Sequence, residues 1–311
     1  MIIKTDCIRE YLAGTDAHIP VGGIPETLVG VSPLKALRDG TLSFVSTYEP
    51  SLIDLLAARR ACVLILHRAY RDELKGLTAT QDANLLIFHD DPRSAYAQLL
   101  TLLLRHNALS HPKARLGAGT LISPTASIRD GVSLGKNCQV GAGAIINPGV
   151  TIGNNCIIGE NAVIGAPGFG IAKDANGNNL RIPHLGGVEI GDNVEIGALA
   201  TVASGTMAPT RLSAYVMIDD HVHVGHNISI GTNTIITAGA VIGGSTSIGS
   251  DCWIGLNATI RDGLTLGDGV VVGMGSIVMK DVGHNETLIP ERTQTNLQRL
   301  QELRKSRKNR A

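Results

Sequence analysis

The sequence predicts a mainly β protein whose central part is a parallel β-helix of hexapeptide repeats. Two observations predict it. An aliphatic residue recurs at every sixth position over most of residues 116–278, and 37 glycines accompany an aromatic content of only 3% in 311 residues. So few aromatic residues do not suit the core of a helical bundle or a β-sandwich. A coil that turns often and stacks small aliphatic side chains needs few of them.

The six-residue repeat occurs in two runs. The first begins at Leu116 and continues to Ile164; it resumes at Ile190 and slips by four residues after Val202. The second run is unbroken and consists of Leu212, Ile218, Val224, Ile230, Ile236, Ile242, Ile248, Ile254, Ile260, Leu266, Val272 and Val278. In a triangular prism each hexapeptide supplies one short strand and one turn, and three of them make one coil with the aliphatic side chains inside. Successive coils then pair at a spacing of about 4.8 Å.

Glycine and cysteine positions follow the same repeat. Glycine often comes directly after the aliphatic residue, as at Gly135 and Gly225, and we expect it there because a tight corner requires a positive φ. Cys138, Cys156 and Cys252 each follow the aliphatic residue by four positions, so we predict that they are core residues. The five cysteines form no CxxC pair, which is typical of reduced thiols in the cytoplasm.

Two segments interrupt the repeat. Residues 165–187 are a polar, Gly- and Asn-rich excursion, and residues 203–212 are a shorter one. Regular coils give rigidity, whereas loops on a rigid scaffold carry function. We therefore expect both segments to leave the wall of the prism and to cover a cleft.

The chain is long enough for more than one domain. The sequence predicts three parts. A small α/β domain is expected at residues 1–108, the β-helix at residues 109–289, and a C-terminal helix with a basic end at residues 290–311. That last helix has leucines on one side, which suits either a solvated terminal helix or a docking surface for an acidic carrier protein.

Within the first domain, three segments carry the prediction. The apolar runs 61–66 and 84–88 predict buried strands, and residues 93–106 have apolar positions at helical spacing. The preceding Asp91-Pro92 pair is a typical helix start.

Charge and hydropathy exclude several classes of protein. The formal net charge is +0 and the isoelectric point about 7.1, so no overall field attracts nucleic acid or an anionic membrane. Asp6 and Arg9 interrupt the apolar N-terminal run, which argues against a signal peptide, and no uncharged apolar stretch is long enough for a transmembrane segment. We therefore expect a cytoplasmic protein.

Several motifs resemble one family of hexapeptide acyltransferases. IGAPGFGIAKDANGN, IPHLGGVEIGDNVEIGA and IDDHVHVGHNISIG in the repeat region are similar to UDP-3-O-acylglucosamine N-acyltransferases of the lipid A pathway. GVSPLKALRDGTLSFVS and LLIFHDDPRSAYAQLL resemble the uridine-binding domain of that family. The resemblance implies a left-handed β-helix and a homotrimer with active sites between neighbouring prisms. It implies transfer of an acyl chain from acyl carrier protein to the amine of a UDP-linked glucosamine in lipopolysaccharide synthesis, without a metal or redox cofactor.

The resemblance also implies catalytic residues. His226 matches the family's catalytic base in the HNxxIG motif, and imidazole suits that role because it titrates near neutral pH. Asp219 matches an acidic residue that orients the imidazole. Gly244, one coil after His226, has a peptide N–H that could stabilise the oxyanion of the thioester.

Further residues are expected to bind substrate. Phe44 matches an aromatic side chain that stacks on uracil, and Tyr48 lies two residues out of register with a second one. His184, in the first interruption, is expected to help close the nucleotide site. Asn227 belongs to the HN motif. His223 is either a wall residue or a substrate contact, and so is the neighbouring His221.

Several features leave other readings open. Ala203-Ser204-Gly205 replaces the Asp-Arg-Gly that is usual in the family, and a second family histidine maps to Gly263. Residues 253–282 look more like coenzyme-A-dependent sugar acetyltransferases, so an alternative is an N-acetyltransferase acting on another nucleotide-linked amino sugar of surface polysaccharide. A zinc cluster of His221, His223 and His226 is a weaker alternative. A non-catalytic sugar-binding or scaffold prism is another, and the presence of His226 argues against it.

Overall fold

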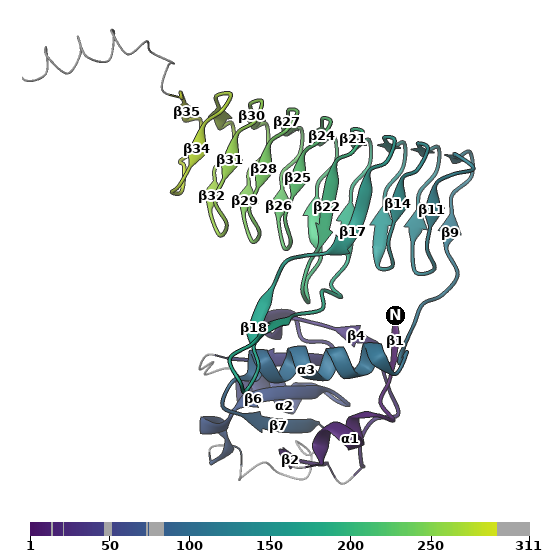
Figure 1. The fold of residues 1–311 in the computed structure, drawn as a ribbon, viewed down its shortest axis with the longest axis vertical. Helices are drawn as coiled ribbons and strands as arrows, with labels where there is room; N and C mark the ends of the chain where they lie inside the picture. The colour runs from purple at the N-terminus through teal and green to yellow at the C-terminus, as the bar shows by residue number, and fades with distance from the viewer. Residues whose placement is uncertain (14, 21, 47–51, 73, 75–83, 291–311) are drawn as a thin grey trace, which may run out of the picture.

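A computed structural model describes residues 1–311 except 14, 21, 47–51, 73, 75–83 and 291–311 (Figure 1). The chain forms an α/β domain and a β-helix, which lie one above the other in the figure. The predicted C-terminal helix, apart from Pro290, and Tyr48 lie outside the described residues.

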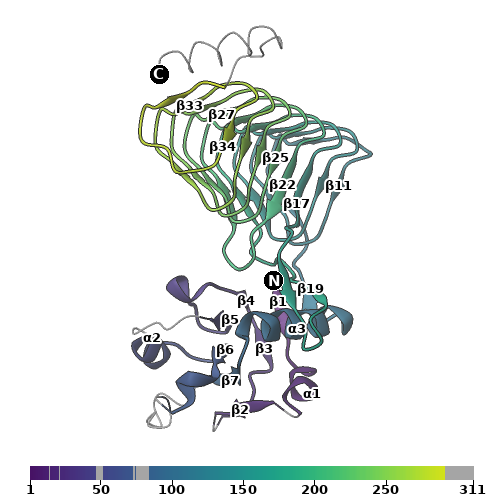
Figure 2. The same cartoon turned by 60° about the vertical axis from the view of Figure 1, so that its left-hand side comes forward.

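The β-helix has three parallel sheets, one on each side of the prism (Figure 2). Sheet 1 contains β9 (Arg115–Leu116), β12 (Ser133–Leu134), β15 (Val150–Ile152), β20 (Val188–Ile190), β23 (Thr210–Leu212), β26 (Ser229–Ile230), β29 (Ser247–Ile248) and β32 (Thr265–Leu266). Sheet 2 contains β10 (Leu121–Ile122), β13 (Gln139–Val140), β16 (Ile157–Ile158), β21 (Glu195–Ile196), β24 (Met217–Ile218), β27 (Ile235–Ile236), β30 (Trp253–Ile254), β33 (Val271–Val272) and β35 (Thr287–Leu288). Sheet 3 contains β11 (Ser127–Ile128), β14 (Ile145–Ile146), β17 (Val163–Pro167), β22 (Thr201–Ser204), β25 (His223–Val224), β28 (Val241–Ile242), β31 (Thr259–Ile260) and β34 (Ile277–Val278).

The register of these sheets confirms the parallel β-helix predicted from the repeat. Ile236 pairs with Ile254 on the next coil, and both side chains are fully buried inside the prism. Each aliphatic residue therefore stacks on its equivalent one coil away, so a column of Val, Ile and Leu forms the core. Cys138, Cys156 and Cys252 are buried in that core, as predicted.

The reason for glycine after the aliphatic residue differs from our expectation. Gly135 and Gly225 do not have a positive φ; the left-handed corner residues come two positions later, as at Asn137 and Asn227. A Cβ atom on Gly135 would lie 2.4 Å from the carbonyl oxygen of Gly153 on the next coil. Glycine is therefore needed there for the close approach of two coils, and the corner itself is most often served by asparagine or by a second glycine.

Both interruptions leave the prism wall. Ile152 pairs with Ile190 instead of with a residue 18 positions on, so the first interruption inserts twenty residues between two coils. It forms an antiparallel hairpin of β18 (Ile171–Lys173) and β19 (Asn179–Arg181). The second interruption adds four residues, because Ile190 pairs with Leu212.

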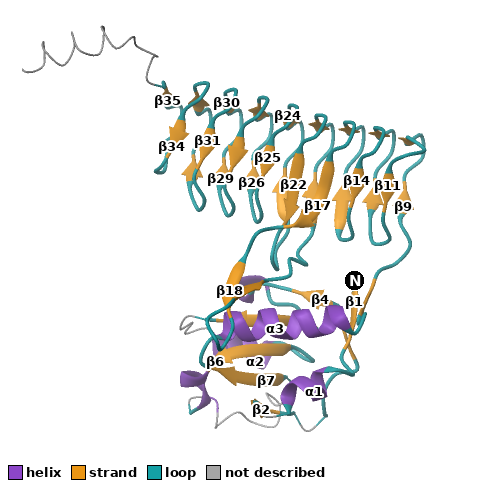
Figure 3. Cartoon of the chain, viewed as in Figure 1, coloured by secondary structure: helices purple, strands orange, loops and turns teal. Residues whose placement is uncertain are grey.

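The N-terminal domain is an α/β sandwich (Figure 3). Its five-stranded sheet has the order β2 (Asp16–His18), β7 (Leu85–His89), β6 (Val63–His67), β5 (Thr41–Val45) and β4 (Gly30–Val31), and only β2 is antiparallel. A smaller antiparallel sheet joins β3 (Thr27–Leu28), β1 (Ile2–Lys4) and β8 (Leu109–Ser110). The helices are α1 (Ile8–Leu12), α2 (Leu52–Ala58), α3 (Pro92–Arg105) and the short 3₁₀ turns η1 (Leu34–Ala36) and η2 (Arg68–Arg71).

The strands and the long helix predicted for this domain are confirmed as β6, β7 and α3. Asp91 caps α3, because its carboxylate accepts hydrogen bonds from the backbone N–H groups of Arg93 and Ser94. None of the described helices is long and apolar enough to cross a membrane.

The hairpin of the first interruption connects the two parts of the molecule. Figure 1 shows β18 leaving the β-helix and reaching α3. Ala172 and Ile182 are buried in the core of the α/β domain, in the same cluster as Tyr96, and the hydroxyl of Ser94 donates to the carbonyl oxygen of Lys173 at 2.6 Å. The 165–187 insertion is thus held by the α/β domain at one end and by the prism at the other.

Candidate active site

A cleft of about 640 Å³ lies on the β-helix where the first interruption crosses the edge of sheet 3. Residues 166–169 and Arg181 of the interruption form one wall. Side chains on the outer face of sheet 3, among them Thr201, His223 and Val241, form the other. Along the bottom lie three residues from the same corner of successive coils, His226, Gly244 and Asp262.

His226 has its orientation and its tautomer fixed by Asn227. The Nδ1 atom of His226 lies 3.1 Å from Oδ1 of Asn227. That oxygen also accepts from the backbone N–H and the hydroxyl of Thr206, while Nδ2 of Asn227 donates to the carbonyl oxygen of Ala208. Since Oδ1 can only accept, Nδ1 of His226 carries the proton and donates it, and Nε2 keeps a free lone pair. His226 therefore presents Nε2 as the basic atom.

Two glycines make room for the imidazole of His226. A Cβ on Gly244 would lie 2.8 Å from Nε2, so the backbone of Gly244 abuts the basic atom. A Cβ on Gly168 would lie 2.6 Å from the Cβ of His226 and 2.9 Å from the ring of His184. The structure thus brings together the predicted pair His226 and Gly244, and it adds Gly168 from the insertion.

His184 lies beside the base. Its ring centroid is 4.9 Å from that of His226, with the rings at 62° to one another. Its Nδ1 atom lies 2.8 Å from the carbonyl oxygen of Ile182, so Nδ1 donates, and its buried Nε2 atom has no hydrogen-bond partner among the described residues. Burial is the main cause that lowers the pKa of His184 to about 4. A positive charge on the neighbouring His226 acts in the same direction.

Asp219 is not placed beside His226 within the chain. It follows β24 of sheet 2, whereas His226 follows β25 of sheet 3, so the two residues occupy different corners of the prism. The carboxylate of Asp219 accepts from the backbone N–H groups of Asp220 and Ala238 and thereby stabilises its own corner. The orienting contact expected from Asp219 is instead made by Asn227, which we had expected to bind substrate.

The other two histidines of the cluster differ in position. His223 lies on the outer face of β25 in the cleft wall, where its Nδ1 atom is 2.7 Å from the hydroxyl of Thr201. His221 is an exposed corner residue with a φ of 58°. In the part of the chain that the structure describes, no three His, Cys, Asp or Glu side chains are grouped to hold a metal ion.

Phe44 lies in the α/β domain and does not line the cleft. It is half-buried on β5, and its ring centroid is 4.8 Å from that of Tyr96 on α3. The expected stacking of Phe44 on uracil remains a prediction. Tyr48, the second aromatic residue expected at the nucleotide site, lies outside the described residues.

Several cleft residues were not identified from the sequence, among them Phe169, Arg181 and Asp262. Phe169 is 75% exposed at the mouth, and the guanidinium of Arg181 lies 5.3 Å from its ring centroid while donating to the carbonyl oxygens of Pro167 and Gly168. Asp262 lies at the bottom, one coil beyond Gly244. The 18-residue coil that places Gly244 after His226 would also have indicated Asp262, whereas the path of the insertion left no periodic pattern to place Phe169 and Arg181.

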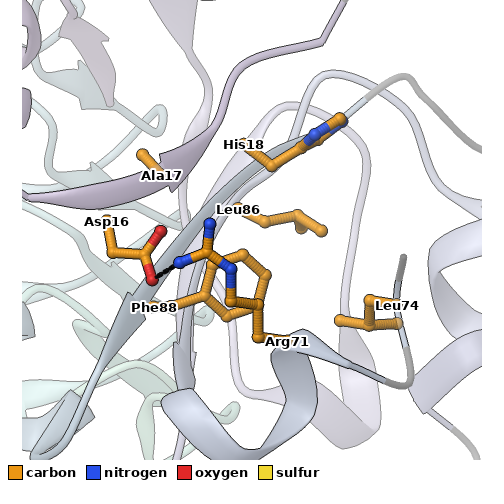
Figure 4. A pocket seen from close by; sticks show the side chains of 7 residues that line it. All are labelled: Asp16, Ala17, His18, Arg71, Leu74, Leu86 and Phe88. Carbon is orange, nitrogen blue, oxygen red and sulfur yellow. Dashed lines mark hydrogen bonds and ion pairs between the residues drawn. The ribbon is translucent and has the colours of Figure 1, made fainter.

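A second hollow lies in the α/β domain, between β2 and the turn η2. Figure 4 shows Arg71 paired with Asp16 across it, above Phe88 and Leu86. Because the ion pair already satisfies its charged groups and none of the expected site residues lines it, this hollow offers no comparable chemistry.

An imidazole with a free Nε2 atom in a cleft of a hexapeptide prism defines the class of hexapeptide-repeat transferases. Consistent with this, the bacterial transferase hexapeptide family matches residues 113–148, 131–166 and 209–244, and the hexapeptide repeat of succinyl-transferase matches residues 245–280. The chain belongs to the UDP-3-O-acylglucosamine N-acyltransferase family.

The relatives with this name include proteins from three organisms. The one from Paracidovorax citrulli is 33% identical over 249 residues, covering 71% of this chain and 66% of that protein. The one from Chlorobium luteolum is 32% identical over 244 residues, covering 68% and 67%. The one from Coxiella burnetii is 38% identical over 217 residues, covering 61% and 60%. The match thus spans about two thirds of the length of these relatives or somewhat less.

A solved structure supports the fold. The UDP-N-acetylglucosamine acyltransferase from Campylobacter jejuni superposes with a TM-score of 0.50 at 26% identity, covering 54% of this chain and 64% of that one. The match to hexapeptide-repeat proteins supports the left-handed form of this fold, which the resemblance implied.

Proposed function

We propose that this protein is an N-acyltransferase that moves an acyl group from a thioester to the amine of a UDP-linked glucosamine. The observation that carries the proposal is the free Nε2 atom of His226, which is held by Asn227 and lies beside the backbone of Gly244 in an open cleft. The names of the relatives support the substrate class.

The proposed mechanism is direct transfer. A protonated amine cannot attack a thioester, so the reacting nitrogen must lose a proton as its bond to the acyl carbon forms. Nε2 of His226 takes that proton, and the peptide N–H of Gly244 stabilises the negative oxygen of the tetrahedral intermediate. When the C–S bond breaks, the imidazolium returns the proton to the leaving thiolate. No step requires a metal or a redox cofactor.

The acyl donor that we propose is acyl carrier protein. The basic C-terminal segment, residues 290–311, favours an acidic carrier, while the resemblance of residues 253–282 to acetyltransferases favours coenzyme A. The cleft adds a physical argument for a chain longer than acetyl, because Ala166, Ala203 and Val241 give it an apolar wall.

We further propose that the protein works as a homotrimer in the cytoplasm. The outer faces of the three sheets differ in polarity. Sheet 1 presents only polar residues at its outward positions (Arg115, Ser133, Thr151, Glu189, Arg211, Ser229, Ser247 and Thr265). In four successive coils sheet 2 presents only Met217, Ile235, Trp253 and Val271. An apolar stripe of this kind suits burial against a second copy of the chain.

The decisive experiment offers purified protein a UDP-linked amino sugar with a free amine. Acyl carrier protein and coenzyme A thioesters of several chain lengths are supplied in parallel, and amide formation is followed by mass. We expect transfer of a long acyl chain from the carrier protein. Acetyl transfer from coenzyme A alone would favour the acetyltransferase alternative. The mechanism would be wrong if His226→Ala turned over as fast as the parent, and a folded trimer without any transferase activity would favour a sugar-binding scaffold.

A further inference from the structure

The insertion places a second imidazole against the proposed base, and no part of the proposed mechanism uses it. His184 is only 6% exposed, yet it is a polar side chain whose Nε2 atom has no partner among the residues described. An orphaned buried nitrogen of this kind costs free energy, so its retention calls for an explanation.

The orientation of His184 is fixed from both sides. Nδ1 donates to the carbonyl oxygen of Ile182, so Nε2 is the acceptor nitrogen. A Cβ on Gly170 would lie 2.8 Å from Cε1, whereas a Cβ on Gly168 would lie 2.9 Å from Nε2 and Cδ2 and 2.6 Å from the Cβ of His226. Gly168 thus lies close to His226 and to the side of the His184 ring that carries the lone pair, and the two imidazole rings meet edge to face at 4.9 Å.

We propose that His184 is a positioning residue that holds the ring of His226 in its reactive orientation and stabilises the imidazolium formed when His226 accepts a proton. An uncharged imidazole with an unpaired acceptor nitrogen interacts better with a neighbouring ring at 4.9 Å when that ring carries a positive charge. This role rests on the proposed function of His226 as base.

The role requires His184 to stay uncharged while His226 gains its proton. Burial keeps the pKa of His184 near 4, so it does not compete for the proton at neutral pH. Positive charges near His184 lower its pKa further. They belong to His226, to Arg181 beside the cleft and to Arg93 on α3. The titratable groups that share the cleft with His226 are His223, Asp262 and Arg181.

NMR titration of histidine-labelled protein tests the proposal without requiring activity. In the wild type, we expect His184 to remain neutral with its proton on Nδ1 from pH 5.5 to 9. In His184→Phe, which keeps a ring but removes the acceptor nitrogen, we expect the pKa of His226 to fall by about half a unit or more. His184→Gln restores an acceptor near the position of Nε2 and is expected to recover most of that shift.

A matched control and a kinetic measurement complete the test. His221→Asn changes a nearby exposed histidine at a left-handed corner that asparagine tolerates, and it should leave the pKa of His226 unchanged. In acyl transfer, His184→Phe should lower kcat about tenfold with little effect on KM and move the acid limb of the pH profile downward. An unchanged pKa of His226 in folded His184→Phe, or titration of wild-type His184 near neutral pH, would overturn the proposal. Because the titration does not depend on transfer, failure of the proposed function would appear separately, as an inactive wild type.

Discussion

At the scale of single residues, access to the base depends on the absence of a side chain at position 244. The φ of Gly244 is one that alanine can adopt, but a Cβ there would lie 2.8 Å from Nε2 of His226. We expect Gly244→Ala to lower kcat about 100-fold, the usual contribution of a general base, with little change in thermal stability. Gly22→Ala is a suitable control, because a Cβ at Gly22 meets nothing within 4 Å. Full activity of Gly244→Ala in the acyl transfer assay would show that Nε2 is not the reacting atom.

Asn227 offers a second test at this scale, through the pH dependence of the reaction. Asn227→Asp keeps an acceptor for Nδ1 of His226 and a residue type that tolerates the left-handed corner, but it adds a negative charge beside the imidazole. The charge favours the imidazolium, so the acid limb of kcat/KM should move up by about one pH unit. Asn257→Asp, at an exposed corner with the same backbone conformation, should leave the profile unchanged. A downward shift in Asn227→Asp would contradict the hydrogen bond to Nδ1.

The sequence identified His226 and Gly244 correctly as neighbours because both obey the 18-residue coil. It could not indicate that His184 meets His226, since the contact depends on how an irregular insertion folds back onto the prism. The role of orienting the base was assigned to Asp219 from the family resemblance, which matches residues along the chain and does not show which corner of the prism each one occupies. In the structure a hexapeptide places Asp219 on another corner, and the adjacent Asn227 makes the contact.

At the scale of the elements, the insertion 165–187 should make stability depend on pH. The pKa of His184 is lowered to about 4 in the folded protein, against about 6.5 when unfolded. The contribution of His184 to the free energy of unfolding is therefore complete above pH 6.5 and is lost as the pH falls toward 4. In this range the unfolded chain binds a proton at His184, whereas the folded chain does not. We expect up to about 3 kcal/mol of unfolding free energy to be lost over this window. Denaturant titrations at pH 7 and 4.5 should show a smaller loss in His184→Gln, and equal losses in both proteins would exclude His184 as the cause.

The elements themselves were predictable to different degrees. The repeat predicted the strands of the prism and the length of both interruptions, because burial inside a triangular coil imposes a six-residue period. It did not explain the glycines, whose role at Gly135 and Gly225 is close packing between coils. That role depends on the distance between backbones, which a one-dimensional pattern does not contain.

At the scale of the whole molecule, the hairpin of β18 and β19 ties the α/β domain to the prism. Ala172 and Ile182 lie in the core of that domain, while Gly168 and His184 of the same insertion border the base. Whatever binds to the α/β domain therefore acts on a segment that also shapes the cleft. This connection gives a physical route from a ligand of the α/β domain to the geometry around His226.

The apolar outer face of sheet 2 gives the prediction that belongs to the whole molecule. Trp253 is 47% exposed in the chain alone and lies in a stripe with Met217, Ile235 and Val271, so we expect it to be buried against a neighbouring copy. Trp253→Glu would place an unpaired charge in that contact, and we expect the trimer to dissociate into monomers. Acyl transfer should fall with it, because the resemblance to the acyltransferase family implies active sites between neighbouring prisms.

Sedimentation velocity of parent and variant at several concentrations measures the change in assembly. Ser247→Glu is the matched control, since Ser247 occupies the outward position of β29 in the same coil but on the polar sheet 1. It should leave both assembly and activity intact, because a charge is tolerated on a face that already carries Arg211 and Glu189. Trimers that persist in Trp253→Glu and dissociate in Ser247→Glu would place the interface on sheet 1. Monomers that keep full activity would show that one prism is sufficient for catalysis.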